Sequence, residues 1–238
     1  MKISIIIPAY NEEGRIQKTA QEYIEYIQQQ MDAAQTELWL VVNGSRDRTA
    51  EICDQLAAQY DFVHSWNSPE RLGKGGAVMK GFELAQGEIL AFSDADNSTT
   101  PPFLHRLIQE VENSADAAIG SRWLPQSRQL IKQPLMRRIA SRVFNIIVRL
   151  LFQLPYRDTQ CGAKAFRNEA LQAIRAQVRT SGWAFDVALI WLMRRQGYTV
   201  QEVPIDWSDN SKSRVRLHTD GPSMLLELLR LRFQNRMP

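Results

Sequence analysis

The feature that most constrains the fold is a regular alternation of short apolar runs and amphipathic stretches in the first half of the chain. Four apolar runs have the length and composition of strands: residues 3–7, 38–42, 62–66 and 88–93. The segments between and after them have helical spacing: residues 13–30, 50–56, 74–86 and the stretch that begins at Pro101. Such alternation predicts an α/β fold, a Rossmann-like and mostly parallel sheet with helices on both faces. The 238 residues suit one large domain of this kind.

Three polar loops follow predicted strands: "PAYNEE" (8–13), "NGSRDRT" (43–49) and "DADNS" (94–98). Ligands of such sheets bind beyond the carboxyl ends of the strands, so these loops are expected to form one binding rim. Asp94 and Asp96 are typical of a turn before a helix, and equally of a site for a divalent cation. The glycines of "RLGKGGAVMKG" (71–81) complete neither a P-loop nor a dinucleotide fingerprint. They favour either a tight turn or a phosphate contact by Lys74.

The charge is divided between the two halves of the chain. Residues 1–121 carry 9 Lys and Arg against 18 Asp and Glu, and residues 122–238 carry 20 against 8. Between Arg122 and Arg167 there are 10 basic residues and one acid, Asp158. A basic stretch without interspersed acids indicates a phosphate or an anionic membrane surface. Nucleic acid is not expected, because no aromatic residues interleave with these arginines as a stacking platform requires.

The second half contains two basic, amphipathic segments. In residues 137–152, Arg138, Arg142, Asn145 and Arg149 share one stripe and the remaining surface is apolar. This pattern fits a helix in a membrane interface, with the arginines turned outward to headgroups, and it fits equally a helix packed on the sheet. Residues 222–238 show the same combination of apolar and basic faces. No run of apolar residues in the chain is long enough to span a bilayer. Two cysteines and three scattered histidines suggest neither disulfides nor zinc, so a cytoplasmic setting with peripheral membrane contact is expected.

Read together, several ordered motifs resemble the family-2 glycosyltransferases of GT-A fold. They are "IIIPAYNEE", "VVNGSRDRT", "LGKGGAV", "DAD", "GSR" (120–122), "RDTQCGAKAF" (157–166) and "GWAFDVALIWL" (182–192). The last two are most similar to the polyprenyl-phosphate branch, above all to dolichyl-phosphate β-glucosyltransferases. The resemblance implies an inverting, metal-dependent transfer of a sugar, glucose in that branch, from a UDP-sugar to a polyprenyl phosphate.

The resemblance also implies roles for single residues on the donor side. The nucleotide would be contacted by Pro8, Ala9, Tyr10, Glu12, Asn43, Lys74 and Asp94. Asp96, with Ser98 as a weaker ligand, would hold Mg or Mn. Asn43 stands where most relatives have a carboxylate, and an amide offers the donor and acceptor that uracil matches. This favours UDP over GDP. Lys212 and Arg214 would close over the diphosphate.

On the acceptor side, the resemblance places the lipid phosphate on Arg122, Arg137, Ser141 and Lys164. Asp186 occupies the position of a catalytic base in relatives with hydroxyl acceptors. A phosphate monoester, with a second pKa of about 6, is already ionised and hardly needs a base. Asp186 is therefore expected to orient Arg122 or Lys164, or to act as the base if the acceptor is a hydroxyl.

Residues 1–121 are thus predicted to be the donor-binding half, and residues 122–238 the acceptor-binding and membrane-associating half, of one GT-A domain with C-terminal amphipathic helices. Two alternatives remain at this point. One is a family-2 enzyme with a soluble or polysaccharide acceptor, and the other is a catalytically silent protein that binds a nucleotide sugar.

Overall fold

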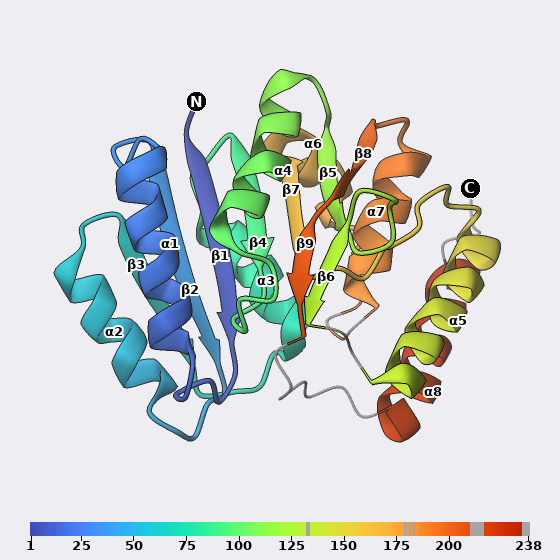
Figure 1. The fold of residues 1–238 in the computed structure, drawn as a ribbon, viewed down its shortest axis with the longest axis horizontal. Helices are drawn as coiled ribbons and strands as arrows, with labels where there is room; N and C mark the ends of the chain where they lie inside the picture. Colours follow the sequence, from blue (N-terminus) through green and yellow to red (C-terminus); the bar gives the residue numbers. More distant parts are fainter. Residues whose placement is uncertain (132–133, 179, 181, 183, 210–216, 235–238) are drawn as a thin grey trace.

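The computed structural model describes residues 1–131, 134–178, 180, 182, 184–209 and 217–234 (Figure 1). Its central sheet has seven strands in the spatial order β3 (Val63–Ser68), β2 (Thr36–Asn43), β1 (Ile3–Ala9), β4 (Ile89–Ser93), β7 (Ala163–Arg167), β5 (Ala117–Ser121) and β8 (Val200–Pro204). A separate parallel pair consists of β6 (Arg128–Ile131) and β9 (Asp206–Ser208). The helices are α1 (Ile16–Gln30), α2 (Thr49–Gln59), α3 (Gly73–Leu84), α4 (Pro101–Asn113), α5 (Leu135–Phe152), α6 (Asn168–Arg175), α7 (Phe185–Arg195) and α8 (Leu217–Gln234).

The sheet separates two hydrophobic cores, and successive side chains along each strand point alternately into one core and the other. In β1, Ile5 and Ile7 enter the first core and Ile6 enters the second. The first core is closed by α1, α2 and α4, and the second by α3, α6 and α7 (Figure 1). The predicted doubly covered sheet is therefore confirmed.

One strand of the sheet runs against the others. β7 pairs antiparallel with both β4 and β5, whereas β1, β2, β3 and β4 pair in parallel and β5 pairs in parallel with β8. The sheet is mostly parallel, as predicted. The insertion of β7 brings the "QCG" turn that precedes it beside the carboxyl end of β4.

α5 and α8 lie side by side at the edge of the second core, far from α1 and α2 (Figure 1). Val148 and Phe152 of α5 are buried in that core. On another face of α5, four apolar side chains, here called the α5 ridge, are about half exposed or more: Ile139 49%, Val143 50%, Ile146 52% and Leu150 76%. The expected packing of this segment on the protein is thus met on one face, and contact with a membrane stays a prediction for the exposed face. No helix in the described part of the chain has the length and apolarity that a membrane span needs.

Candidate active site

The loops that follow β1 and β2 are joined by hydrogen bonds at the carboxyl edge of the sheet. The Asn11 N–H donates to Ser45 Oγ (2.9 Å), and the Arg46 N–H donates to Asn11 Oδ1 (2.7 Å). The Glu12 N–H donates to Thr49 Oγ1 (2.7 Å). Asn11 adopts the left-handed conformation (φ 50°), which an asparagine tolerates well. Two of the three predicted rim loops therefore form a single wall.

Several of the residues predicted to contact the nucleotide lie at this wall. Pro8 and Ala9 are the last residues of β1, and the Tyr10 ring lies 4.5 Å from the Arg71 guanidinium. Asn43, 3% exposed at the end of β2, donates from Nδ2 to Ala9 O (3.1 Å). One amide N–H of Asn43 thus fixes the end of β1 to the end of β2.

The Asp-x-Asp motif follows β4 directly. The Asp94 N–H donates to Gly162 O (3.0 Å), and the Ser98 N–H donates to Asp96 Oδ1 (2.9 Å). The Asp94 carboxylate packs on Gly162 so closely that a Cβ at residue 162 would lie 1.9 Å from Asp94 Oδ2. Only glycine leaves room for the carboxylate in this position.

Asp94 is the outer member of a chain of four charged side chains, here called the four-charge chain: Lys164, Asp186, Lys74 and Asp94. Lys164 Nζ lies 2.6 Å from Asp186 Oδ1, Lys74 Nζ lies 4.0 Å from Asp186 Oδ2, and Lys74 Nζ lies 2.6 Å from Asp94 Oδ1. Lys164 is fully buried and Asp186 is 2% exposed. The alternating signs compensate one another, which is what buried charges require. Of the two cations expected beside Asp186, the structure gives Lys164.

The two carboxylates of the motif differ in their electrostatic surroundings. Burial disfavours the charge on Lys74, but Asp94 and Asp186 outweigh it and raise the pKa of Lys74 above its ordinary value. Burial, followed by the charge of Asp94, raises the pKa of Asp96. The negative charge of Asp94 is thus compensated by Lys74, whereas the surroundings of Asp96 disfavour its negative charge.

These residues fit a divalent cation. Carboxylate and hydroxyl oxygens are the ligands that Mg²⁺ and Mn²⁺ prefer, and a cation would stabilise the negative charge on Asp96 that burial and Asp94 disfavour. Among the described residues, no three His, Cys, Asp or Glu side chains gather as a metal site. Asp96 and Ser98 would therefore supply only part of a ligand set, and a bound diphosphate would supply more.

On the acceptor side, Arg122 makes a bidentate pair with a fully buried carboxylate. Its Nε and Nη2 lie 2.6 and 2.9 Å from Asp158 Oδ2 and Oδ1. Although burial opposes both charges, Arg122 holds the pKa of Asp158 below its ordinary value. The Arg122 guanidinium, which was expected to bind a phosphate, therefore already binds Asp158. Asp158 was not predicted as a site residue. It is the one acid among ten basic residues between Arg122 and Arg167, which indicates that it pairs with one of them.

The other predicted acceptor residues are spread over two elements. Arg137 and Ser141 are half-buried in the first turns of α5, and Lys164 lies in β7 within the four-charge chain. Lys212 and Arg214, the predicted lid, lie outside the described residues.

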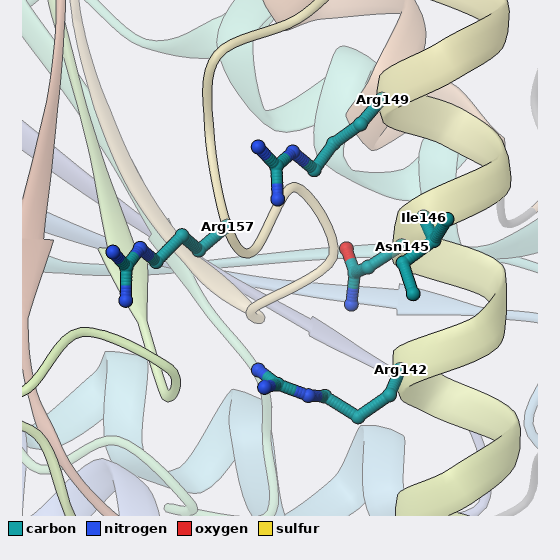
Figure 2. Close-up of a pocket in the computed structure, with 5 residues that line it drawn as sticks. All are labelled: Arg142, Asn145, Ile146, Arg149 and Arg157. Carbon is teal, nitrogen blue, oxygen red and sulfur yellow. The ribbon is translucent and has the colours of Figure 1, made fainter.

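Arg142 and Arg149 of α5, which were expected to face outward, are exposed. They line a pocket with Arg157, in the loop after α5, and their side chains project toward that loop (Figure 2). Asn145 lies between them on the same face, so the face holds a polar stripe. Helical spacing places these three residues on one face but does not say what the face meets.

Comparisons with known proteins agree with this arrangement. The model of the family described as Glycosyl transferase family 2 matches residues 4–175. Glycosyltransferase AglD of Haloferax volcanii is 36% identical over 98% of this chain, which spans only 37% of that protein. Dolichyl-phosphate beta-glucosyltransferase ALG5D of Trichomonas vaginalis is 30% identical over 96% of this chain and 72% of its own length. The dolichyl-phosphate beta-glucosyltransferase of Saccharomyces cerevisiae is 30% identical over 97% of this chain and 74% of its own length.

A solved structure shares the fold. It is glucosyl-3-phosphoglycerate synthase from Mycobacterium tuberculosis in complex with Mn²⁺, UDP and glucosyl-3-phosphoglycerate, which is 19% identical, with a TM-score of 0.70 over 97% of this chain and 79% of that one. The expected GT-A type fold is therefore confirmed, and so is the resemblance to the polyprenyl-phosphate branch. By the family match and by its relatives, the chain belongs to glycosyl transferase family 2.

Proposed function

We propose that this protein transfers glucose from UDP-glucose to a polyprenyl phosphate of the dolichyl type, with a divalent cation and at the cytoplasmic face of a membrane. One observation carries the proposal. The four-charge chain holds Asp94 beside Asp96 at the sheet edge, in a chain whose relatives named dolichyl-phosphate beta-glucosyltransferase match across nearly its whole length.

The donor would lie along the wall formed by the β1 and β2 loops. Asn43 would face the base and Tyr10 the nucleoside, while the diphosphate would extend toward Asp94 and Asp96. A cation on Asp96 and Ser98 would neutralise the charge that develops on the diphosphate as its bond to the anomeric carbon breaks. Gly162 and Lys74 keep the Asp94 carboxylate at the rim and limit its movement.

The reaction would be a single displacement with inversion. An oxygen of the acceptor phosphate forms the new bond to the anomeric carbon, and UDP leaves with the electron pair of the old one. A phosphate dianion has no proton to lose, so no side chain has to accept one. Asp186 suits this scheme, because its two oxygens face Lys164 and Lys74 and hold those cations in place.

Two observations support contact with a membrane. Among the described residues, the large hydrophobic side chains that are exposed lie in β6, α5 and α8, apart from Met1. The same half of the chain holds the excess of basic residues. An apolar face bordered by arginines is suited to an anionic bilayer surface. The two cysteines are free and buried, which fits the reducing cytoplasmic side.

The test is transfer of labelled glucose from UDP-glucose to dolichyl phosphate in detergent with Mg²⁺ or Mn²⁺. Three proteins are compared: the wild type, Asp96→Asn, and Asp61→Asn as a matched control at an exposed carboxylate before β3. We expect lipid-extractable product from the wild type and from Asp61→Asn, and a loss of about 10²-fold or more with Asp96→Asn, because several kcal/mol of charge stabilisation is removed.

Two results would contradict the proposal. Lipid product from Asp96→Asn at the wild-type rate would remove the metal role of the motif. Transfer to water-soluble acceptors but not to dolichyl phosphate would favour the alternative with a soluble or polysaccharide acceptor, and UDP binding without turnover would favour the silent protein.

A further inference from the structure

A pocket of about 240 Å³ lies between α5 and the loop that follows it, and three of its five lining residues are arginines. The lining residues are Arg142, Asn145, Ile146, Arg149 and Arg157. Figure 2 shows Arg142, Asn145 and Arg149 projecting from α5 toward the loop that carries Arg157. None of these five belongs to the four-charge chain, to the predicted metal ligands or to the predicted acceptor-phosphate residues. This α5 pocket is therefore a second candidate site.

The positive charge of the α5 pocket is not balanced within the described structure. No ion pair of Arg142, Arg149 or Arg157 exists among the described residues, and Arg142 lies 4.6 Å from the Trp123 ring. The carboxylate next in sequence, Asp158, is bound by Arg122. Arg142 and Arg149 project two like charges toward the cavity, so an anion there would be stabilised by both of them.

Glu202 also lies close to this region, and it is engaged elsewhere. Its Oε1 accepts hydrogen bonds from the backbone N–H groups of Arg157 and Asp158, both at 2.8 Å. These bonds fix the loop that carries Arg157.

The pocket is held in shape by Asn145, which is 3% exposed. Its Oδ1 accepts from the Thr159 N–H (3.3 Å) and its Nδ2 donates to Ser141 O (3.1 Å). Asn145 thus ties α5 to the loop at the level of the arginines. A site whose walls are already fixed loses less entropy when it binds a ligand.

An apolar groove of about 640 Å³ adjoins the pocket. It shares Ile146 and Arg149 with the pocket and adds Leu150, Gln153, Leu154 and Pro155. Ile146 and Leu150 are also members of the α5 ridge, which is bare in the described structure. A cationic pocket that leads into an apolar groove is complementary to an amphiphile with a phosphate head.

We propose that the α5 pocket binds the phosphate of an anionic phospholipid and that the groove takes the first part of an acyl chain. The inference deepens the membrane contact proposed above and rests on it. A polyprenyl phosphate carries a single phosphate, which must reach the donor at the sheet edge to react. A second phosphate pocket therefore serves a second molecule, and a bilayer phospholipid supplies both its anion and its chain.

The test is flotation of the purified full-length protein with vesicles of phosphatidylcholine alone and of phosphatidylcholine with phosphatidylglycerol. The variant is Arg142→Gln/Arg149→Gln/Arg157→Gln. The matched control is Lys18→Gln/Arg48→Gln/Arg106→Gln, on the α1, α2 and α4 side, and each set lowers the formal net charge from +3 to 0. We expect binding of the pocket variant to the anionic vesicles to fall at least about tenfold below that of the control, since each arginine near such a surface contributes.

Two results would overturn the inference. One is an equal loss in the two variants, and the other is undiminished binding of the pocket variant. If the pocket variant floats normally but no longer glucosylates dolichyl phosphate in detergent, the pocket belongs to the acceptor. Arg149→Gln alone, at an exposed position, is the substitute if the triple variant does not fold. Because flotation needs neither donor nor acceptor, an inactive protein that still binds anionic vesicles through the pocket refutes the proposed activity and leaves the pocket standing.

Discussion

Gly162 determines where the Asp94 carboxylate lies, although its own position in the sequence gives no hint of this. We predict that Gly162→Ala lowers the transfer rate by about 10²-fold. The new Cβ would lie 1.9 Å from Asp94 Oδ2, so the carboxylate has to move. A displacement of about 1 Å in an active site lowers the rate by about this factor. Gly14→Ala is the control, because a Cβ there meets no atom within 4 Å. Rates and far-UV circular dichroism are measured together. Full activity of folded Gly162→Ala would show that Asp94 need not be held in this place.

Asp158 is predicted to contribute stability rather than chemistry. Asp158→Asn leaves the Arg122 guanidinium in a buried place without its counter-charge, so we expect the free energy of unfolding at pH 7 to fall by about 3–5 kcal/mol. The exposed control Asp61→Asn should change it by less than about 0.5 kcal/mol. Urea denaturation measures both. A loss of transfer in Asp158→Asn without a loss of stability would be inconsistent with this role.

The same pair predicts a pH dependence with a definite sign. The pKa of Asp158 in the folded protein lies below its ordinary value of 3.8, so the carboxylate binds a proton more readily in the unfolded chain. Its stabilisation is fully present above the unfolded pKa of about 3.9 and is lost as the pH falls through the folded pKa. The difference between wild type and Asp158→Asn should stay constant from pH 7 to about pH 5 and shrink below about pH 4.

Single residues show where sequence reasoning succeeds and where it stops. Asp94 and Asp96 were singled out by their type and their place after a buried strand, while their roles came from the family resemblance and stay predictions. The pairing of Lys74 with Asp94, and of Arg122 with Asp158, joins segments that are 20 and 36 residues apart. Such contacts depend on how the strands order themselves in the sheet, which no local spacing encodes.

At the scale of elements, α5 has three faces that lie in different surroundings. One is buried in the second core, one forms the α5 pocket, and the α5 ridge is bare. We predict that Ile139→Ser/Val143→Ser weakens flotation with anionic vesicles about tenfold, because two half-exposed apolar anchors are removed from the interface. The melting temperature should not change, because these side chains pack on little.

Val148→Ser supplies the contrast on the same helix. Val148 is fully buried, so this variant should lose about 2–4 kcal/mol of unfolding free energy, with the melting temperature falling accordingly. If the melting temperature of Ile139→Ser/Val143→Ser also falls, the α5 ridge is covered by protein in solution and its contact with a membrane is contradicted.

The elements of the first half could be predicted because their period is local. β1, α1, β2 and α2 lie where the alternation of residues 3–56 puts them. β7 was not anticipated as an antiparallel insertion between β4 and β5, since a five-residue run such as "AKAFR" is compatible with many neighbours. The polar stripe of α5 was predicted correctly as a stripe, but the pocket that it forms with the loop of Arg157 could not be predicted, because helical periodicity contains no information on that loop.

At the scale of the whole molecule, the predicted division at residues 121 and 122 runs through one continuous sheet. β7, from the second half, pairs with β4 and β5 of the first half, and both cores contain residues from both halves. We therefore predict that residues 1–121 alone do not fold cooperatively, because β4 and β5 lose their shared neighbour and the second core lies open. Urea unfolding of this fragment should show no sigmoidal transition. A cooperative transition would mean that the donor half is an independent domain.

The proposed donor site also joins the two halves, since Asp94 and Lys74 come from the first and Asp186 and Gly162 from the second. A nucleotide that binds there should stabilise the entire fold, by about 2.7 kcal/mol at a hundredfold excess over its dissociation constant. We predict that UDP with Mn²⁺ raises the melting temperature more than either alone, and that Asp96→Asn removes the increment due to the metal while Asp61→Asn keeps it. Given the amide of Asn43, UDP should stabilise more than GDP at equal concentration. Thermal unfolding monitored by tryptophan fluorescence measures each case. Equal shifts for UDP with and without metal would separate Asp96 from metal binding, whatever the activity of the enzyme.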